Sequence, residues 1–205
     1  SNSGTYTATI GNATSIVNNY SMSFDGVTDY VEINTPTHGP TTNNDFTTSF
    51  WVKPTSNNGY YGLTSQYHNF NNSNSNYYIT QENNQYKVTG NGIDVLYFGQ
   101  PQINVWQYIS VVFYSTGQVE TYINGIQTGS STLTLSNNVS DKPLEIGRLV
   151  SGGSGSTIQP FSGNIDNVET WNIALTQQEI QQYMNCTPTG NEAGLVGYWN
   201  FEEGS

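Results

Sequence analysis

Residues 106–128, WQYISVVFYSTGQVETYINGIQT, decide the fold class. The segment from Tyr108 to Tyr114 consists almost entirely of β-forming residues, a pattern typical of a strand buried on both faces. Two more short strand patterns, at 119–123 and 126–128, flank the dipeptide Asn124-Gly125. This dipeptide is the strongest local signal for a β-hairpin, because both residues tolerate the positive φ that a tight hairpin turn requires.

Further strand patterns follow outward from this hairpin to both ends of the chain, separated by turn residues. They are expected at 21–24, 30–33, 46–52, 144–146, 165–171 and 195–201. Many short strands at this spacing predict an all-β fold, a two-sheet antiparallel sandwich or jelly roll. The apolar residues expected in its core are Phe24, Val31, Phe50, Val52, Ile109, Val111, Phe113, Ile123, Ile146, Ile165 and Val168.

One short helix is predicted near the end of the chain. Residues 176–179, TQQE, form a capping box, in which Thr176 caps the third amide of the helix and Glu179 reaches back to the cap. Leu175 and Ile180 occupy the positions of a hydrophobic staple. The helix should end near Met184 and, being too short to be stable alone, should dock on the sandwich.

Composition narrows the range of functions. The 205 residues include 15 acidic and 4 basic side chains, which give a net charge of −11. So few basic residues disfavour binding to nucleic acid or to an anionic membrane surface. An acidic surface suits divalent cations and neutral partners such as sugars, or it serves solubility alone. The single cysteine, Cys186, excludes an internal disulfide, and no apolar run is long enough to span a membrane.

Seven short motifs, taken in order, resemble the laminin G-like jelly-roll modules of the concanavalin A-like lectin and glucanase superfamily. They lie at 24–31, 46–54, 106–112, 122–125, 161–168, 171–172 and 175–180. The resemblance implies two antiparallel sheets packed face to face with one short docked helix. It also implies an extracellular or cell-surface location within larger, often bacterial, multidomain proteins that bind glycans or surfaces.

The expected domain organisation is a laminin G-like sandwich over residues 1–186, followed by a linker and terminal strand over 187–205. Residues 194–204 either supply a last strand to this sandwich or open a following module. Two stretches, 57–76 and 151–156, are expected to be loops because they are rich in Asn, Ser and Gly. We expect the chain to be a segment of a larger secreted protein.

The resemblance further implies a structural calcium ion at the edge of the sandwich. The family often holds one near the opening turn and the aspartate of the closing strand, which assigns Asp25 and Asp166 as ligands and Asp29 as a further candidate. Calcium prefers carboxylate and carbonyl oxygens, which an Asp-Gly turn can supply. The alternative is that Asp25 only bonds the backbone of its own turn.

Aromatic residues in loop-like sequence are the candidates for ligand binding. Tyr60, Tyr61, Tyr67 and His68 lie among Asn, Ser and Gly, and Tyr97 precedes a Gly-containing turn. Sugars stack on aromatic rings and bond to neighbouring amides, so this mixture predicts carbohydrate recognition, with simple loop packing as the alternative. A different role is expected for the tryptophans, which lie in strand-like motifs and are assigned to the core. These are Trp51, Trp106, Trp171 and Trp199.

Catalysis is disfavoured. His38 and His68 have no nucleophile motif nearby. A glycosidase needs two facing carboxylates, and strand alternation places Asp166 and Glu169 on opposite faces. The sequence therefore predicts a non-catalytic module that recognises carbohydrate or a cell-surface component. The alternatives are a structural spacer beside a catalytic domain and a glycoside hydrolase or lyase.

Overall fold

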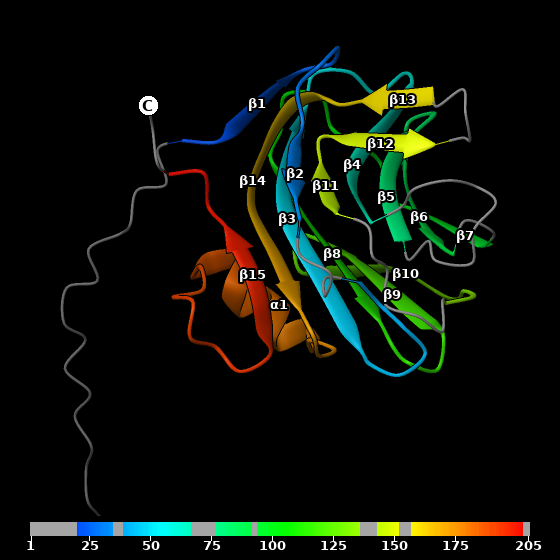
Figure 1. The fold of residues 1–205 in the computed structure, drawn as a ribbon, viewed down its shortest axis with the longest axis vertical. Coiled ribbons are helices and arrows are strands. Elements are labelled where there is room, and N and C mark those ends of the chain that lie inside the picture. The colour runs from blue at the N-terminus through cyan, green and yellow to red at the C-terminus, as the bar shows by residue number, and fades with distance from the viewer. Residues whose placement is uncertain are drawn as a thin grey trace, which may run out of the picture.

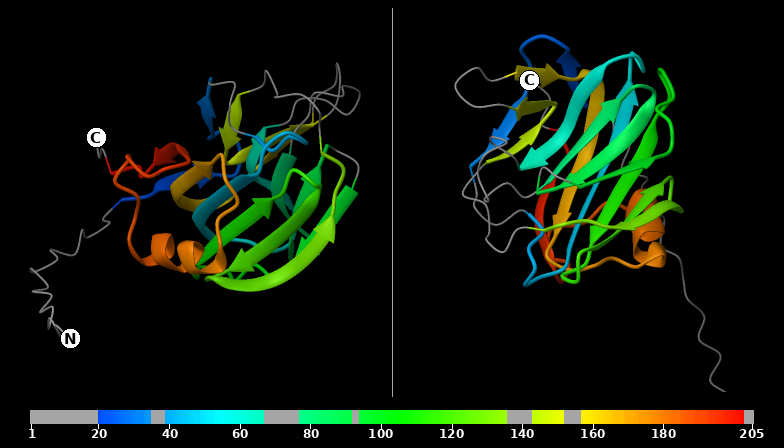
Figure 2. Two further views of the ribbon diagram at one scale, coloured as in Figure 1. Left: turned by 90° about the horizontal axis from the view of Figure 1, so that it is seen from below. Right: turned by 90° about the vertical axis from the view of Figure 1, so that its right-hand side faces the viewer.

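The computed structural model of the chain describes residues 20–34, 39–66, 77–91, 94–135, 143–151 and 157–202. Two antiparallel sheets pack face to face, and a short helix lies on the outside of one of them (Figures 1 and 2). This arrangement confirms the predicted two-sheet sandwich with one docked helix.

The larger sheet has seven strands. Six follow the order β1-β14-β3-β8-β9-β10, and β15 also pairs with β14. Their bounds are β1 Met22–Asp25, β3 Phe46–Pro54, β8 Gln107–Phe113, β9 Gln118–Ile123, β10 Ile126–Thr132, β14 Ser162–Trp171 and β15 Leu195–Trp199. β1 pairs with the first half of β14 and β15 with its second half. The segment near residue 195 therefore adds a strand to this sandwich, one of the two alternatives that the sequence leaves open.

The smaller sheet has six strands in the order β2-β11-β4-β5-β6-β7. Their bounds are β2 Val31–Ile33, β4 Tyr60–Gln66, β5 Tyr77–Glu82, β6 Gln85–Gly90, β7 Asp94–Phe98 and β11 Leu144–Ile146. A separate hairpin of β12 (Arg148–Ser151) and β13 (Thr157–Pro160) lies against β4, where Leu149 covers Gly62. This hairpin closes part of the outer face of the six-stranded sheet.

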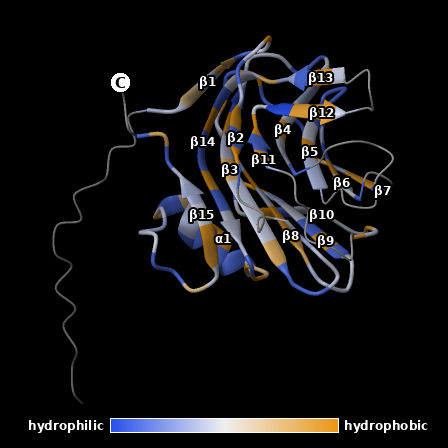
Figure 3. Cartoon of the chain, viewed as in Figure 1, coloured by the Kyte–Doolittle hydropathy of each residue, from blue (hydrophilic) through white to orange (hydrophobic). Residues whose placement is uncertain are grey.

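The main core lies between the two sheets. Of the eleven residues predicted for it, nine are buried there, and Val31 and Ile123 pack against it half-buried. Hydrophobic and hydrophilic segments alternate along the strands, as expected when one face of each sheet turns inward (Figure 3). Tyr77 reaches into this interior from β5 and packs against Phe46 and Phe113 of the other sheet.

A second apolar cluster lies outside the sandwich, between the seven-stranded sheet and the helix. It contains Tyr108, Val112, Tyr122, Trp171, Leu175 and Ile180. The helix α1 (Gln177–Asn185) begins at Thr176 with both hydrogen bonds of the predicted capping box, and both staple residues are buried. Docking therefore supplies the stability that nine residues lack on their own. Cys186 follows the helix and is exposed and unpaired.

One expectation about the six-stranded sheet is wrong. The stretch 57–76 was expected to be a loop, but its residues 60–66 form β4, in the middle of that sheet. The strand is recognisable in retrospect because Tyr61 and Leu63 alternate on the inner face, and its hydrogen bonds to β5 and β11 outweigh the loop-like composition. Of the other expected loop, 151–156, residues 152–156 lie outside the described part of the chain, and Ser151 is the last residue of β12.

Candidate functional site

The structure brings two of the predicted tyrosines together on the outer face of the six-stranded sheet. Tyr60 from β4 and Tyr97 from β7 surround the ammonium of Lys87, together with Tyr78 from β5. The Lys87 Nζ atom lies 4.6 Å from the ring centroid of Tyr60, 5.8 Å from that of Tyr78 and 5.9 Å from that of Tyr97. We call these four residues and Glu82 the tyrosine cluster.

The two charged residues of the tyrosine cluster, Lys87 and Glu82, are paired with each other. Lys87 is 7% exposed and forms an ion pair with Glu82, and the Tyr97 hydroxyl donates to Glu82 Oε2 at 3.3 Å. Tyr97 itself is 44% exposed. The cluster thus presents an aromatic surface whose central cation and anion are already paired.

The other predicted aromatics do not join this cluster. Tyr61 points to the opposite face of β4, packs against the main core, and donates its hydroxyl to the Asn58 carbonyl at 3.1 Å. Tyr67 and His68 lie outside the described residues. Sequence alternation could have separated Tyr60 from Tyr61, because neighbouring residues of a strand face opposite sides.

An open hollow of about 610 Å³ lies on the outer face of the seven-stranded sheet. Its walls include the indoles of Trp51 and Trp106, the side chains of Lys53 and Asp166, and Met184 at the end of α1. We call it the tryptophan pocket. Its volume lies within the roughly 300–1,000 Å³ range of small-molecule sites, and it combines apolar walls with a few polar groups, as such sites do.

Local strand geometry explains why these residues meet. Trp51 and Lys53 are two residues apart in β3 and therefore share its outer face. Asp166 of β14 is the register partner of Trp51. Trp106 directly precedes β8, whose Gln107 is the register partner of Val52, so it comes alongside Lys53. The pocket thus forms where three neighbouring strands present aromatic and charged side chains outward.

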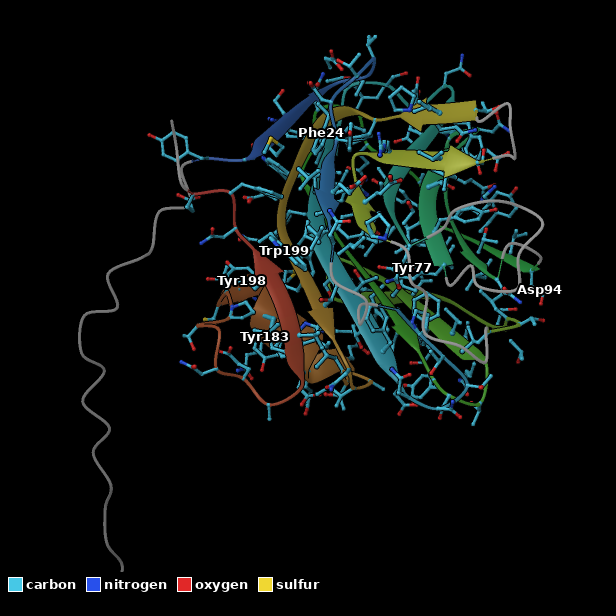
Figure 4. All side chains as sticks on the ribbon, in the orientation of Figure 1. Phe24, Tyr77, Asp94, Tyr183, Tyr198 and Trp199 are labelled. Carbon is cyan, nitrogen blue, oxygen red and sulfur yellow. The ribbon has the colours of Figure 1, made fainter. Side chains whose placement is uncertain are left out.

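A β-bulge shapes the β14 side of the pocket. The register between β14 and β3 shifts between Asp166 and Glu169, and Asn167 adopts a positive φ of 46°. The Asn167 amide donates to Asp166 Oδ1 at 2.8 Å, and its side-chain oxygen accepts from the Tyr198 hydroxyl, also at 2.8 Å. Figure 4 shows Tyr198 on β15, beside α1 and Tyr183. Hydrogen bonds to Asp166 within β14 and to Tyr198 of β15 therefore both stabilise the bulge.

The bulge also corrects the expected placement of the two acids of β14. Asp166 and Glu169 pair with Trp51 and Ser49, which are two residues apart in β3, so both acids lie on its outer face. Simple alternation failed because the bulge inserts one extra residue. The two acids still do not form an accessible pair, since Glu169 is fully buried beneath α1.

Glu169 is buried among neutral hydrogen-bond donors. Its Oε2 atom accepts from the Tyr108 hydroxyl at 3.3 Å and from Trp171 Nε1 at 3.2 Å. Burial raises the pKa of the Glu169 carboxyl to about 8, against the smaller opposing effect of these two bonds. Tyr108 also contacts the Trp51 ring, with centroids 5.3 Å apart, so this buried acid lies one residue behind the pocket wall.

Three of the four tryptophans assigned to the core pack in or against an apolar cluster, Trp51 among them, whereas Trp106 belongs to neither cluster. Trp171 is fully buried under α1, and Trp199 packs half-buried against the main core (Figure 4 labels it on β15). Trp51 and Trp106 are half-buried and line the pocket. The sequence pattern could not predict this difference, because it assigns a residue to a strand but does not show whether other elements cover the outer face of that strand.

The predicted calcium ligands are not brought to one place. In the register of β1 and β14, Asp25 is opposite Ser162, four residues before Asp166. At about 3.3 Å per residue their backbone positions lie roughly 13 Å apart along the sheet, and a shared Ca²⁺ would need oxygens of both side chains within about 2.6 Å of the ion. A calcium ion shared by Asp25 and Asp166 does not fit this geometry.

Asp25 instead organises its own turn. Its Oδ1 atom accepts from the amides of Val27, Thr28 and Asp29 at 2.7, 2.9 and 3.2 Å, and Asp29 Oδ2 accepts from the Asp25 amide at 3.0 Å. These amide bonds, that of Thr28 first, lower the pKa of the Asp25 carboxyl. Among the described residues, no three His, Cys, Asp or Glu side chains are grouped to hold a metal ion.

Fold and pocket together define a two-sheet jelly-roll module with a concave aromatic site outside its core. The chain belongs to the concanavalin A-like lectin/glucanases superfamily, whose sequence profile matches residues 25–181. A search of curated proteins gives no match. Within the described part of the chain, no helix is both long and apolar enough to cross a membrane.

Solved structures with similar folds come from varied proteins. A candidate carbohydrate-binding protein of Bacteroides ovatus is 14% identical with a TM-score of 0.67, over 89% of this chain and 53% of that one. A heptameric SAP-like pentraxin of Limulus polyphemus is 18% identical with a TM-score of 0.63, over 89% and 88%. The binding domain of botulinum neurotoxin serotype D is 16% identical with a TM-score of 0.55, over 82% and 43%. This chain thus spans about half of the Bacteroides protein, and such low identities establish the fold alone.

Proposed function

We propose that this chain is a non-catalytic carbohydrate-recognition module and that the sugar binds in the tryptophan pocket. The observation that carries the proposal is the meeting of two half-buried indoles, Trp51 and Trp106, with Lys53 and Asp166 in one hollow of about 610 Å³. The apolar face of a pyranose ring packs well on an indole, while its hydroxyls need charged or amide partners at the ring edge.

The tyrosine cluster is the second candidate for the same function, as the sequence predicted. Its exposed Tyr97 ring favours stacking. Its polar groups are less suited to a ligand, because Lys87 and Glu82 form an ion pair with each other, whereas Lys53 in the pocket has no carboxylate at salt-bridge distance among the described residues. We therefore place the sugar in the tryptophan pocket and use the tyrosine cluster as the comparison in the test.

The family supports an extracellular or cell-surface setting within a larger protein, with a glycan or cell-surface component as the partner. Family members with this fold also include enzymes, so fold alone does not exclude hydrolysis. Asp166 and Glu169 do not support glycoside hydrolysis, because Glu169 is buried beneath α1 and cannot face a sugar together with Asp166. The module would then position a neighbouring domain on a glycan-bearing surface.

The test is a glycan array followed by calorimetry with two matched variants. Trp106→Ala should weaken binding of any array hit roughly 10- to 30-fold, because a central aromatic contact is removed. Tyr97→Ala, an aromatic truncation on the opposite sheet, should leave binding within about twofold, since it lies outside the contact. Repeating the array with calcium and with chelator also tests whether any calcium is needed.

The opposite result for the two variants would assign binding to the tyrosine cluster. If Tyr97→Ala abolishes binding and Trp106→Ala does not, the tyrosine cluster is the binding surface. If no glycan binds the wild-type chain, or if an oligosaccharide is cleaved, the proposed function is wrong. Thermal melts of both variants show whether a loss of binding is only a loss of folding.

A further inference from the structure

Lys53 differs from the other basic residues that the structure describes. Lys87 is paired with Glu82, and Arg148 is paired with Glu145 and Glu32. Among the described residues, Lys53 has no carboxylate within salt-bridge distance. In a chain with 15 acidic and only 4 basic residues, a lysine without such a partner in the wall of a pocket is unexpected.

The Lys53 ammonium is held in place by an indole. Its Nζ atom lies 5.2 Å from the ring centroid of Trp106, a cation–π distance, and its register partner in β14 is the neutral Asn164. The side chain is half-buried. A lysine held against an aromatic ring loses less conformational freedom when a ligand binds, so its charge is available at a lower entropic cost.

We propose that the sugar bound in the tryptophan pocket carries an anionic group, a carboxylate or a sulfate, which pairs with Lys53. This rests on the proposed function and narrows it to acidic glycans. Lysine suits either group because its ammonium is a compact charge without the planar geometry that favours bidentate pairing. The Trp51 indole is then the stacking surface for the sugar ring.

Asp166 gives the pocket a second, opposite charge. It pairs in register with Trp51, two residues from Lys53 along β3, and it is 5% exposed. A carboxylate at this wall repels a second anion. The pocket therefore selects a ring with its anionic group at the Lys53 end and hydroxyls at the Asp166 end, since specificity combines attraction with repulsion.

The net charge of −11 does not oppose this pairing at close range. At physiological ionic strength the Debye length is about 8 Å, so carboxylates on distant parts of the surface are largely screened. A direct contact with Lys53 is screened much less. The acidic surface is expected to slow the approach of an anionic glycan more than it weakens the bound state.

The experiment uses sets of glycans with one backbone in three forms: neutral, carboxylated and sulfated. Binding is measured for the wild-type chain, Lys53→Met and Lys53→Arg at low and high salt. Methionine keeps an unbranched stem to pack on Trp106 but lacks charge, and arginine keeps the charge. A melting curve for each variant shows whether it is folded.

In at least one set, the wild-type chain should bind an acidic form roughly 10- to 100-fold more tightly than the neutral form, the range expected for a hydrogen bond to a charged group. Lys53→Met should remove that difference, Lys53→Arg should keep most of it, and high salt should reduce it. A carboxylate preference and a sulfate preference each support the proposal and identify the group.

Other outcomes contradict the proposal in distinguishable ways. Equal or tighter binding of the neutral forms, with Trp106→Ala still weakening it, would overturn the acidic preference and leave carbohydrate binding in place. An acidic preference that persists in Lys53→Met would assign the anion to another residue and overturn the role of Lys53. No binding by any glycan form would overturn the proposed function and this inference together.

Discussion

Glu145 on the six-stranded sheet and Glu169 on the seven-stranded sheet are both buried glutamates on outer faces of the same sandwich. Glu145 is 1% exposed, and its Oε1 atom accepts two bonds from Arg148, at 3.0 Å from Nε and 2.6 Å from Nη2. Glu169 is fully buried and receives only the neutral donors Tyr108 and Trp171.

The same contrast extends to the surroundings of the two acids. On the six-stranded sheet, Lys87 and Arg148 each have carboxylate partners. On the seven-stranded sheet, the raised pKa of Glu169 favours its neutral form, and Lys53 has no carboxylate at salt-bridge distance among the described residues. The described basic residues of the first face are paired with acids, whereas the second face holds a buried glutamate and a lysine that are not paired with opposite charges among the described residues.

The largest expected effect comes from removing a base on the first face. Arg148→Met should lower the free energy of unfolding by about 3–5 kcal/mol, because it leaves the Glu145 carboxylate buried without a counter-charge. Urea unfolding at pH 7 measures this. Because Arg148 also stacks on Tyr30, with Cζ 3.2 Å from the ring centroid, part of the loss is packing.

A double variant separates charge from packing. Adding Glu145→Gln to Arg148→Met removes the unpaired charge and should restore most of the lost stability. A loss below about 1 kcal/mol for Arg148→Met alone would mean that its pair with Glu145 resembles an exposed one, and the contrast between the two faces would fail.

The sequence predicted the elements whose determinants are local. The Asn124-Gly125 turn is confirmed by φ values of 51° and 72°, and the capping box at Thr176 is confirmed with both of its hydrogen bonds. The core residues were also predictable, since alternation along a strand places them on one face. Each of these features depends on residues within a few positions of one another.

The strands of the six-stranded sheet were largely missed because their residues are polar. β4 to β6 combine Tyr with Thr and Gln, and they are strands because their neighbours complete the hydrogen bonding. One local signal was available: Asn83 and Asn84 have φ values of 49° and 64° and form the two-residue turn between β5 and β6. Asn-Asn is a weaker signal for such a turn than Asn-Gly.

The candidate site was predictable only in part. The sequence singled out Tyr60 and Tyr97, but Lys87 between them depends on the pairing of four strands. The tryptophan pocket depends on the bulge at Asn167 and on where α1 docks, and neither position follows from alternation. Long-range packing decides which aromatic residues on an outer face remain open.

Glu169, the buried acid of the seven-stranded sheet, should make the stability of the chain depend on pH. The pKa of Glu169 is about 8 in the folded chain, against an ordinary value of 4.5. Between these pH values the unfolded chain loses the proton while the folded chain keeps it, so stability falls as pH rises. Glu169 should contribute a slope of up to about 1.4 kcal/mol per pH unit in this window.

Glu169→Gln should remove that contribution, because the amide does not titrate. Unfolding free energies measured from pH 4.5 to pH 9 should therefore fall less steeply with pH in the variant than in the wild-type chain. Parallel curves would show that Glu169 is ionised in the folded state, and the seven-stranded sheet would then hold an unpaired buried charge, contrary to the comparison.

The smallest expected effect concerns α1, the helix that covers part of the outer face of the seven-stranded sheet. α1 covers Glu169 on one side and supplies Met184 to the pocket wall. Thr176→Ala removes the bond from the Glu179 amide to Thr176 Oγ1, 3.3 Å long, and should cost about 1 kcal/mol, while Thr176→Ser keeps the hydroxyl and should cost little. Hydrogen exchange should show less protection in α1 and unchanged protection in β5 and β6, because local opening of a docked helix leaves the opposite sheet folded. Equal loss of protection in α1 and β5 would mean that both faces open as one unit, and the properties of the pocket could no longer be treated apart from those of the tyrosine cluster.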